Sequence, residues 1–596
     1  MLRRWYYVLP TMALLTIVLA PAVRADDEKP DKKTDKKPTV AVFKLEGELT
    51  EQPAPDAFPF GSLNQTNLKD LVAHMNKAAD DAQVKGVVVL LEGASIGTAQ
   101  KEEVRQAMKK LRDAGKEIYA HADSLQMGEY ALLAGASRLS VVPTGDLWVT
   151  GMHGEAPYVR GLLDHIAVQP DFLTCGKYKS AAEVFMRREP SPEAHAMQNW
   201  LFDGIFETYC KMIAEGRKVD VAKVKAWIDD GPYTAERAKQ VGLIDAVEHR
   251  QDFEAAIKKK IGDDLVFNKK YGEKEMPKPD FNNPFAIFKI LGEMMGETKA
   301  KKKDDKPAVG IVYVEGAISL GKSEPSPFGA AEGAHSTDIR KALDEAARDD
   351  NIKAVVLRVN SPGGSAVASE IILDATKRVK AKKPFVVSMG NVAGSGGYYV
   401  ACASDTIFAD ESTITASIGV VSGKLVTNPM WARLGITFTP YQRGKNAGML
   451  SSAKPFSDEE RKRMQGYMDE IYGVFKNHVT TIRGSKLKKP IDELAGGRVF
   501  TGKMAVENKL VDRVGTLDDA ITEAKSLAGL KADEPIDRLE LPKPKSIFEQ
   551  LFGGAAAETR LPIPRDLAAQ FARAETLRRL LSKPAVLMMP CQVRIK

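Results

Sequence analysis

The sequence has few cysteines, few histidines and little excess of either charge. Its 596 residues include 4 cysteines and 8 histidines, and 86 Lys and Arg against 79 Asp and Glu give a net charge of +7. Such a balance argues against a protein that binds nucleic acid. No cysteine belongs to a CxxC pair or has a histidine at ligand spacing, so we expect no zinc site and no obligatory disulfide. The cysteines are Cys175, Cys210, Cys402 and Cys591.

Long apolar runs are also missing after the first 25 residues. Residues 1–25, MLRRWYYVLPTMALLTIVLAPAVRA, combine a basic start, one apolar run and an end that suits signal peptidase. They predict either a cleaved signal peptide or an uncleaved N-terminal anchor. In both cases we expect the body to be associated with the inner (cytoplasmic) membrane and to face the periplasm or the cell exterior. Residues 26–37, DDEKPDKKTDKK, predict a charged tether.

What the sequence does contain is one module written twice. PTVAVFKLEG at residue 38 recurs as PAVGIVYVEG at residue 307, and a long gapless stretch of matched positions follows. Within it Lys85 matches Lys353, and Gly128 matches Gly396. Such self-similarity indicates tandem domains. We predict a first repeat at 38–261, a linker with an amphipathic helix at 262–306, a second repeat at 307–535, and a C-terminal arm and tail at 536–596.

Each copy alternates strand patterns with helix patterns. GVVVLL at 86–91 and AVVLRV at 354–359 are short β-branched runs of the kind found in buried strands. Helical patterns follow at 101–114 and 368–380, and then the strand patterns EIYAHA and PFVVSM. This order predicts an α/β protein in which each repeat has a largely parallel sheet covered by helices.

Two glycine-rich turns distinguish the second copy. NSPGGS at 360–365 and AGSGG at 393–397 each follow a predicted strand. A strand end, a Gly-Gly turn and a helix start present free backbone N–H groups, which an oxyanion hole requires. Ser395 lies between glycines, and we expect it to be sterically exposed, as a nucleophile must be. The alternative is a pair of ordinary tight turns, in which glycine is needed only because it adopts positive φ easily.

The first copy lacks this serine but holds a lysine that the second copy lacks. Met127 stands at the position of Ser395, and the Gly-Gly pair of the other turn is also absent. Further along, GKYKSA has Lys179 where GKNAGM has Ala447. One copy therefore supplies a candidate nucleophile and the other a candidate base.

Histidine is a poor alternative to that lysine. Only His478 follows Ser395, on the helical run MDEIYGVFKNHV, and the G-x-S-x-G elbow is broken at Ala393. A lysine can act as a base if burial lowers its pKa enough to leave the amine neutral.

The motifs VAGSGGYYVACASD, ITASIGVV, NSPGGS and GKYKSAAEVF resemble those of the signal peptide peptidase A (SppA) family in its long tandem form. The resemblance covers most of the chain and implies two tandem ClpP/crotonase-like repeats and a Ser/Lys peptidase. It implies that Ser395 is the nucleophile and Lys179 the general base. It further implies that Ser417 holds the lysine amine and that Gly364 and Gly396 donate the oxyanion N–H groups.

Two positions depart from the family pattern. Members often have Ala where this chain has Gly394, and EPF where it has EVF after the lysine motif. Neither departure touches a reacting atom.

The resemblance implies an exported or membrane-associated serine endopeptidase that hydrolyses membrane-derived peptides such as cleaved signal peptides. No metal or cofactor is expected, and a homo-oligomer near the membrane is. A crotonase-like acyl-CoA enzyme would use the same sheet and similar oxyanion turns, without a nucleophilic serine. A non-enzymatic scaffold for membrane proteins is the third alternative.

Overall fold

The computed structural model describes residues 37–51, 67–273, 306–323, 325–326, 329–330, 333–531, 534–542 and 585–589. The described residues from Pro38 onward belong to one compact unit. The predicted signal peptide or anchor, all but the last residue of the tether, and the amphipathic linker helix lie outside the described residues.

The first repeat is built on a sheet whose strand pairs are all parallel. The strand order is β10 (Val266–Asn268), β1 (Thr39–Glu48), β2 (Val84–Ser95), β3 (Glu117–Ala122), β5 (Arg138–Val141) and β9 (Ala246–Val247). The second repeat repeats this parallel plan in the order β24 (Asp537–Leu541), β11 (Ala308–Glu315), β16 (Ile352–Ser361), β18 (Phe385–Gly394), β19 (Thr406–Ala409) and β23 (Arg513–Val514). It adds β20 (Ile414–Ala416), which is parallel to the end of β18, and β22 (Val499–Thr501), which is antiparallel to β20.

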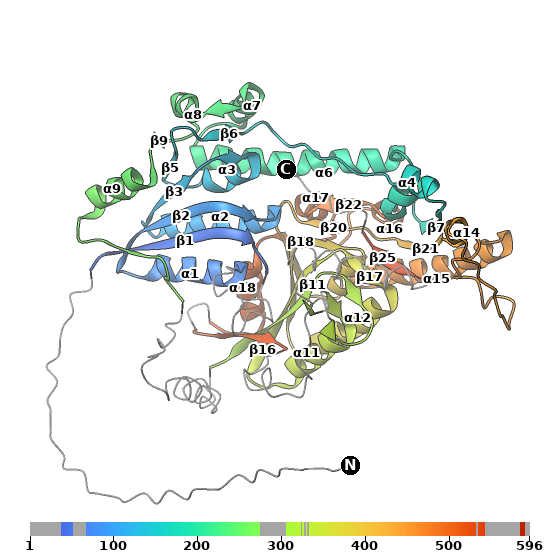
Figure 1. Cartoon of the computed structure of the whole chain (residues 1–596). Coiled ribbons are helices and arrows are strands. Elements are labelled where there is room, and N and C mark those ends of the chain that lie inside the picture. Colours follow the sequence, from blue (N-terminus) through green and yellow to red (C-terminus); the bar gives the residue numbers. More distant parts are fainter. Residues whose placement is uncertain are drawn as a thin grey trace, which may run out of the picture. The chain divides into compact units, whose positions relative to one another are not determined.

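The central strands are apolar on both faces because helices cover both faces of each sheet (Figure 1). In β2, Val87 and Val89 pack with helices α1 and α2, whereas Val88 and Leu90 pack on the other side with α9. In β16, Val355 and Leu357 face α11 and α12, and Val356 faces α18. The flanking helices are α1 (Leu68–Asp80), α2 (Thr98–Asp113), α9 (Arg250–Ile261), α11 (Ser336–Arg348), α12 (Ala366–Lys380) and α18 (Leu517–Leu527).

The remaining elements are shorter or lie around the two sheets. The helices are α3 (Met127–Leu133), α4 (Arg160–His165), α5 (Glu183–Met186), α6 (Pro192–Arg217), α7 (Val221–Asp230), α8 (Ala235–Val241), α13 (Gly396–Ala401), α14 (Asn428–Arg433), α15 (Asp458–Arg483), α16 (Ile491–Leu494) and α17 (Gly502–Glu507). The small strands are β4 (Leu125–Gln126), β6 (Asp146–Trp148), β8 (Tyr233–Thr234), β13 (Pro325–Ser326) and β14 (Gly329–Ala330).

A third sheet joins the two repeats. Its order is β15 (Ala334–His335), β12 (Ile318–Ser319), β17 (Gly363–Ser365), β25 (Val586–Met588), β21 (Val420–Val426) and β7 (Gln169–Cys175). Here β7 of the first repeat pairs antiparallel with β21 of the second along seven residue pairs, from Val420↔Cys175 to Val426↔Gln169. The first repeat thus sends a strand into the second.

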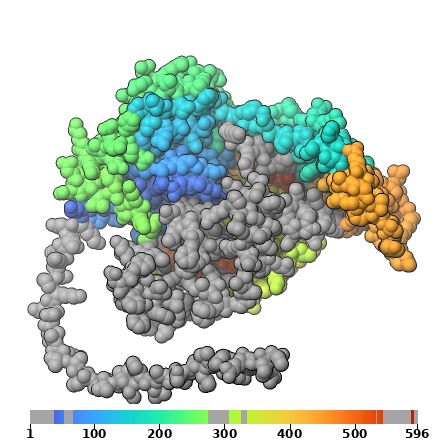
Figure 2. Space-filling view, viewed as in Figure 1, coloured from blue at the N-terminus to red at the C-terminus, as the bar shows by residue number. Residues whose placement is uncertain are grey.

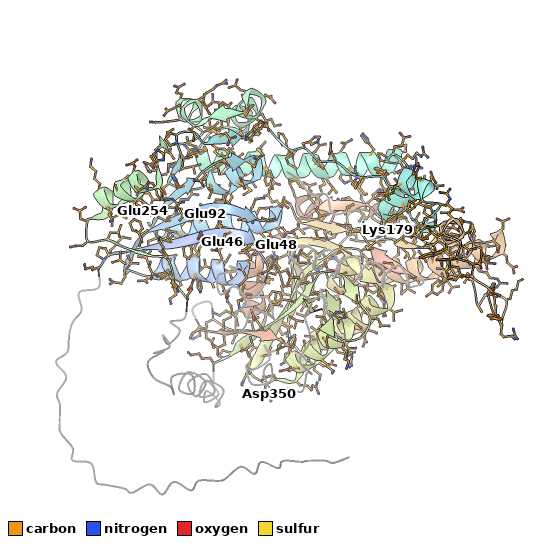
Figure 3. All side chains as sticks on the ribbon, viewed as in Figure 1. Glu46, Glu48, Glu92, Lys179, Glu254 and Asp350 are labelled. Carbon is orange, nitrogen blue, oxygen red and sulfur yellow. The ribbon has the colours of Figure 1, made fainter. Side chains whose placement is uncertain are left out.

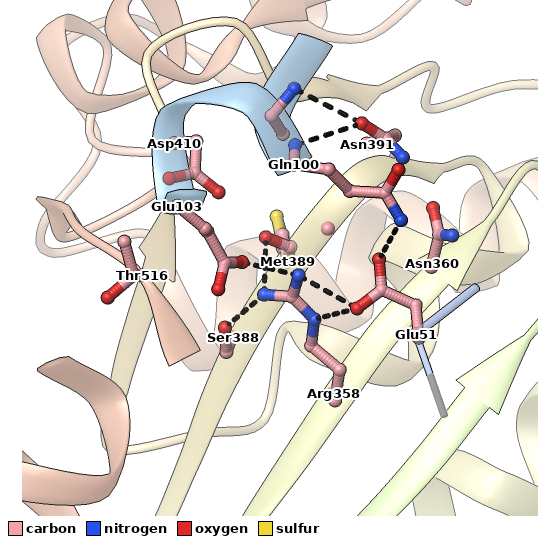
Figure 4. A network of polar contacts seen from close by, with 12 residues as sticks. Glu51, Gln100, Glu103, Arg358, Asn360, Ser388, Met389, Asn391, Asp410 and Thr516 are labelled. Atoms are coloured by element: carbon pink, nitrogen blue, oxygen red, sulfur yellow. Dashed lines mark hydrogen bonds and ion pairs between the residues drawn. The ribbon is translucent and has the colours of Figure 1, made fainter. Parts of the chain in front are cut away.

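A buried ion cluster also spans the two repeats (Figure 4). Arg358 of β16, whose side chain is 0% exposed, pairs with Glu51 and with Glu103 of α2. Its guanidinium also donates to the Ser388 hydroxyl at 2.7 Å. Removing one partner of such a buried pair costs about 3–5 kcal/mol, because an uncompensated charge remains. The ion cluster therefore ties residues of the first repeat to β16 of the second.

The predicted elements are confirmed with small shifts of their ends. The strand patterns at 86–91 and 354–359 lie within β2 and β16, and the helical patterns at 101–114 and 368–380 correspond to α2 and α12. The α/β class with largely parallel sheets is confirmed as well. The domain boundaries stay a prediction.

Candidate active site

Ser395 lies at a sharp turn between β18 and α13. Its φ of 52° is in the left-handed region, which non-glycine residues rarely occupy. Its backbone N–H donates to the Ala416 carbonyl at 2.6 Å, and this bond ties the turn to the end of β20. A strained backbone held by its neighbours fixes the direction of the hydroxyl.

The second glycine turn lies directly beside this serine. It follows β16 and places Gly363 and Gly364 in β17. A Cβ built on Gly396 would lie only 3.1 Å from the Gly364 nitrogen, so the two predicted N–H donors are close together. Ser361 holds the turn, because its hydroxyl accepts from the Gly363 N–H at 3.1 Å and donates to the Gly316 carbonyl at 2.6 Å.

Lys179 reaches Ser395 because β7 crosses into the second repeat. The GKYKSA segment follows β7 directly, and Figure 3 shows Lys179 apart from Glu46 and Glu92 of the first sheet. The Lys179 Nζ lies 2.8 Å from Ser395 Oγ, within hydrogen-bond distance. It donates to the Ser417 carbonyl at 3.0 Å and the Ser417 hydroxyl at 3.1 Å. The structure thus brings together Ser395, Lys179 and Ser417.

The surroundings of Lys179 disfavour its charge. The side chain is buried, with a residue exposure of 2%, and all three of its hydrogen-bond partners are uncharged. Burial therefore lowers the pKa of Lys179 well below its usual range. A neutral amine 2.8 Å from a hydroxyl can accept that hydroxyl's proton.

Two glycines that the sequence reasoning missed make room for this lysine. Tyr178 N–H donates to the Gly496 carbonyl at 2.9 Å. A Cβ on Gly497 would lie 2.5 Å from the Lys179 nitrogen, and the φ of Gly497 is +84°. A side chain at Gly497 would therefore push Lys179 away from Ser395. The repeat held a signal for this pair, because Asp229 and Asp230 occupy the matching places in the first copy.

The other candidates lie elsewhere. His478 on α15 contacts Glu370 at 3.0 Å and Lys377 at 3.4 Å, so its ring is engaged away from the serine. Met127 is buried in α3, and Ala447 is exposed. Among the described residues, no group of three or more His, Cys, Asp or Glu side chains could hold a metal ion. The described cysteines, Cys175, Cys210 and Cys402, are buried free thiols.

The expectation of an exposed serine is wrong. Ser395 is 0% exposed, and so is Ser417. A segment from far along the sequence packs on the turn, including Met589, whose Sδ lies only 2.7 Å from where a Cβ on Gly394 would be. A local glycine pattern predicts a tight turn but carries no information about a distant segment that packs over it.

Comparisons with known proteins agree with these features. Residues 110–262 and 377–531 match peptidase family S49, and residues 330–415 match the Clp protease family. The chain is 31% identical to Protease 4 of Haemophilus influenzae over 78% of this chain and 74% of that protein. It is 30% identical to Protease 4 of Salmonella typhi over 86% of this chain and 81% of that protein.

A plant relative extends the likeness. The chloroplastic serine protease SPPA of Arabidopsis thaliana is 27% identical over 87% of this chain and 73% of that protein. The S49 match occurs twice, once in each repeat, and together the two matches span more than half of the chain. The chain therefore belongs to peptidase family S49 and is a serine peptidase with two tandem S49 repeats, the second of which also matches the Clp protease family.

Proposed function

We propose that this peptidase cleaves peptide bonds with a Ser395–Lys179 dyad assembled across its two repeats. The observation that carries the proposal is the 2.8 Å contact between the Lys179 amine and the Ser395 hydroxyl inside a buried site. Burying a lysine whose partners are all neutral costs folding free energy, and lysines with such lowered pKa values are found mainly at functional sites. At this site a neutral Lys179 amine would accept the proton of Ser395.

The chemistry is acyl transfer. Lys179 takes the Ser395 proton while Oγ attacks the substrate carbonyl, and the N–H groups of Gly364 and Gly396 stabilise the oxyanion. The protonated lysine then gives its proton to the leaving amine. Water next releases the acyl group, with Lys179 again acting as the base. Ser417 keeps the amine pointed at Oγ through its two contacts.

The two alternative functions account for fewer of the features of the site. A crotonase-like acyl-CoA enzyme needs the oxyanion turns but neither the serine nor a neutral lysine. A scaffold needs none of the three. Membership of a peptidase family and the cross-repeat contact both favour hydrolysis.

The pH dependence of hydrolysis tests the base. The active form of Lys179 is the neutral amine, so kcat/KM should rise with pH through its pKa and then level off. Because burial lowers that pKa, the plateau should begin below the value of about 10.4 that a free lysine has. Initial rates on an apolar peptide between pH 5 and 11 measure the profile. A rate that keeps rising to about 10.4, or that does not depend on pH, would contradict a buried lysine base.

The free energy of unfolding should also depend on pH through Lys179. The unfolded chain binds a proton at Lys179 more tightly than the folded chain, so this residue makes unfolding easier at low pH and stability rises with pH.

Peptides left in or near a membrane are the proposed substrates, and spent signal peptides are the leading example. The support is the apolar N-terminal segment, which predicts export or anchoring of the chain on the outer face of the inner membrane. Within the described part of the chain, no helix has the length and hydropathy of a membrane span.

A homo-oligomer is proposed as well, and the repeat supports it. In the first copy β7 pairs with β21 of the second copy, whereas the second-copy counterpart of β7, residues 437–443, forms no strand. This segment follows α14 in the orange region of Figure 2, and Phe438 and Tyr441 within it are 58% and 93% exposed. The first-copy counterpart of β21, residues 152–158, forms no strand either. A second chain could pair the two in the way that β7 pairs with β21.

We expect three or more chains per particle. Light scattering at micromolar concentration should give a multiple of the 65.1 kDa chain mass. The double variant Phe438→Asp and Tyr441→Asp should reduce the mass to one chain and leave circular dichroism unchanged, because both side chains are exposed. A wild-type particle of one chain would contradict the proposal.

A further inference from the structure

The last described segment of the chain lies on the active site. β25 pairs antiparallel with β17, in the register Gly363↔Met588, Gly364↔Leu587 and Ser365↔Val586. It also pairs antiparallel with β21 at Val421↔Val586, and Figure 1 shows it beside these strands. Met589 N–H donates to the Pro362 carbonyl at 2.9 Å. The tail is therefore held by the backbone of the same turn that carries Gly364.

The side chains of this strand fill apolar pockets on alternating sides, as those of an extended peptide do. Val586 and Met588 pack with Phe172, Ala181 and Val421. Met589 packs with a different set, Met197, Leu201 and Val499. Leu587 is 0% exposed. Four consecutive apolar residues thus occupy sites that both repeats build.

The Leu587 carbonyl lies at the predicted oxyanion turn. A Cβ built on Gly363 would lie 2.0 Å from the Leu587 oxygen and 2.6 Å from the Gly396 nitrogen. The register also sets Leu587 opposite Gly364. A substrate carbonyl must reach the N–H groups of Gly364 and Gly396 at this turn to be attacked by Ser395.

Gly394 gives the strand additional room. A Cβ on Gly394 would lie 2.7 Å from Met589 Sδ and 3.1 Å from Met589 Cβ. An alanine at this position would therefore crowd Met589. The glycine at this position and the tail residue that lies over it fit together.

We propose that Val586–Met589 is an inhibitory strand, which occupies the substrate cleft and must leave before a peptide can bind. Substrates then add to β17 and β21 as an extended strand with apolar side chains at successive positions, in the place of the tail. This inference rests on the proposed function, because it takes Ser395 as the nucleophile. A strand tethered to the chain competes at a high effective concentration, so its removal lowers the apparent KM.

Truncation tests the strand directly. A chain that ends at Ser582 lacks it, and a matched control that ends at Gln592 keeps it. We expect kcat/KM for an extended apolar peptide to rise about tenfold in the shorter chain, chiefly through KM, with no change in the control. Intact-mass measurement verifies that the strand is present in wild type and control.

A point variant covers the case in which the shorter chain does not fold. Gly394→Ala in the full-length chain should crowd Met589 and raise kcat/KM in the same direction by a smaller factor. Equal or lower kcat/KM in both the shorter chain and Gly394→Ala, with thermal unfolding unchanged, would overturn the proposal and leave β25 a packing element.

Peptide binding separates this inference from the proposed function. In a Ser395→Ala background, a fluorescein-labelled AVLMM peptide should bind the chain that ends at Ser582 and bind the full-length chain at least about tenfold more weakly. Anisotropy reports this without any hydrolysis, so it holds even if Ser395 proves not to be the nucleophile. Equal binding to both chains, or binding to neither, would contradict occupation of the cleft by the tail.

Discussion

Replacing Ser395 with alanine should abolish peptide hydrolysis and leave the fold intact. The hydroxyl is the only group removed, and the Lys179 amine keeps both of its contacts with Ser417. The turn is held by the Ser395 N–H bond to Ala416, which alanine also makes. We expect kcat/KM to fall by about four orders of magnitude or more, because the remaining N–H donors cannot form an acyl-enzyme by themselves.

The measurement is kcat/KM on a chromogenic apolar peptide beside a thermal unfolding curve. A small change in the unfolding midpoint with lost activity supports the assignment. Activity near that of the wild type would remove Ser395 from the mechanism and direct attention to His478.

Lys179→Ala should inactivate as thoroughly as Ser395→Ala. The two residues act as one unit, so the double variant should be no worse than either single variant. Lys179→Arg should also be inactive, because a guanidinium stays charged and cannot take a proton. The expected loss is again about four orders of magnitude.

Lys177 is the matched control. It lies two positions before Lys179, is exposed, and has a counterpart, Lys445, in the second copy. Lys177→Ala should keep nearly full activity. An inactive Lys177→Ala beside an active Lys179→Ala would show that the base is misassigned by two residues. Activity in both would place the base within the second repeat.

The repeat made much of this predictable from sequence. β-branched runs identify β2 and β16 because a strand buried on both faces must be apolar throughout. The comparison of copies singles out Ser395 and Lys179 because each copy is the other's control: the fold is shared and these residues are not. In the structure Lys179 Nζ and Ser395 Oγ lie 2.8 Å apart, as that comparison leads one to expect.

Long-range packing was not predictable in the same way. Met589, nearly two hundred residues after Ser395, packs beside Gly394 in the turn of the serine, and no local pattern around either segment predicts that contact. The pairing of β7 with β21 is similar, because the two strands come from different repeats and no local pattern pairs them. The close approach of Gly497 to Lys179 is an intermediate case, because the double glycine was visible and only its partner was hidden.

Because β7 of the first repeat pairs with a strand of the second, the active site can form only after both repeats have been synthesised. Lys179 precedes Ser395 by 216 residues, so a ribosome adds the serine about 10 to 40 s after the lysine. Until β21 exists, β7 has no partner strand and the lysine amine stays in water, where it is protonated and harmless. On the proposed mechanism a nascent first repeat is therefore inactive, because it has neither the serine nor a neutral lysine. The order of the two copies along the chain therefore delays activity until the second repeat has been synthesised.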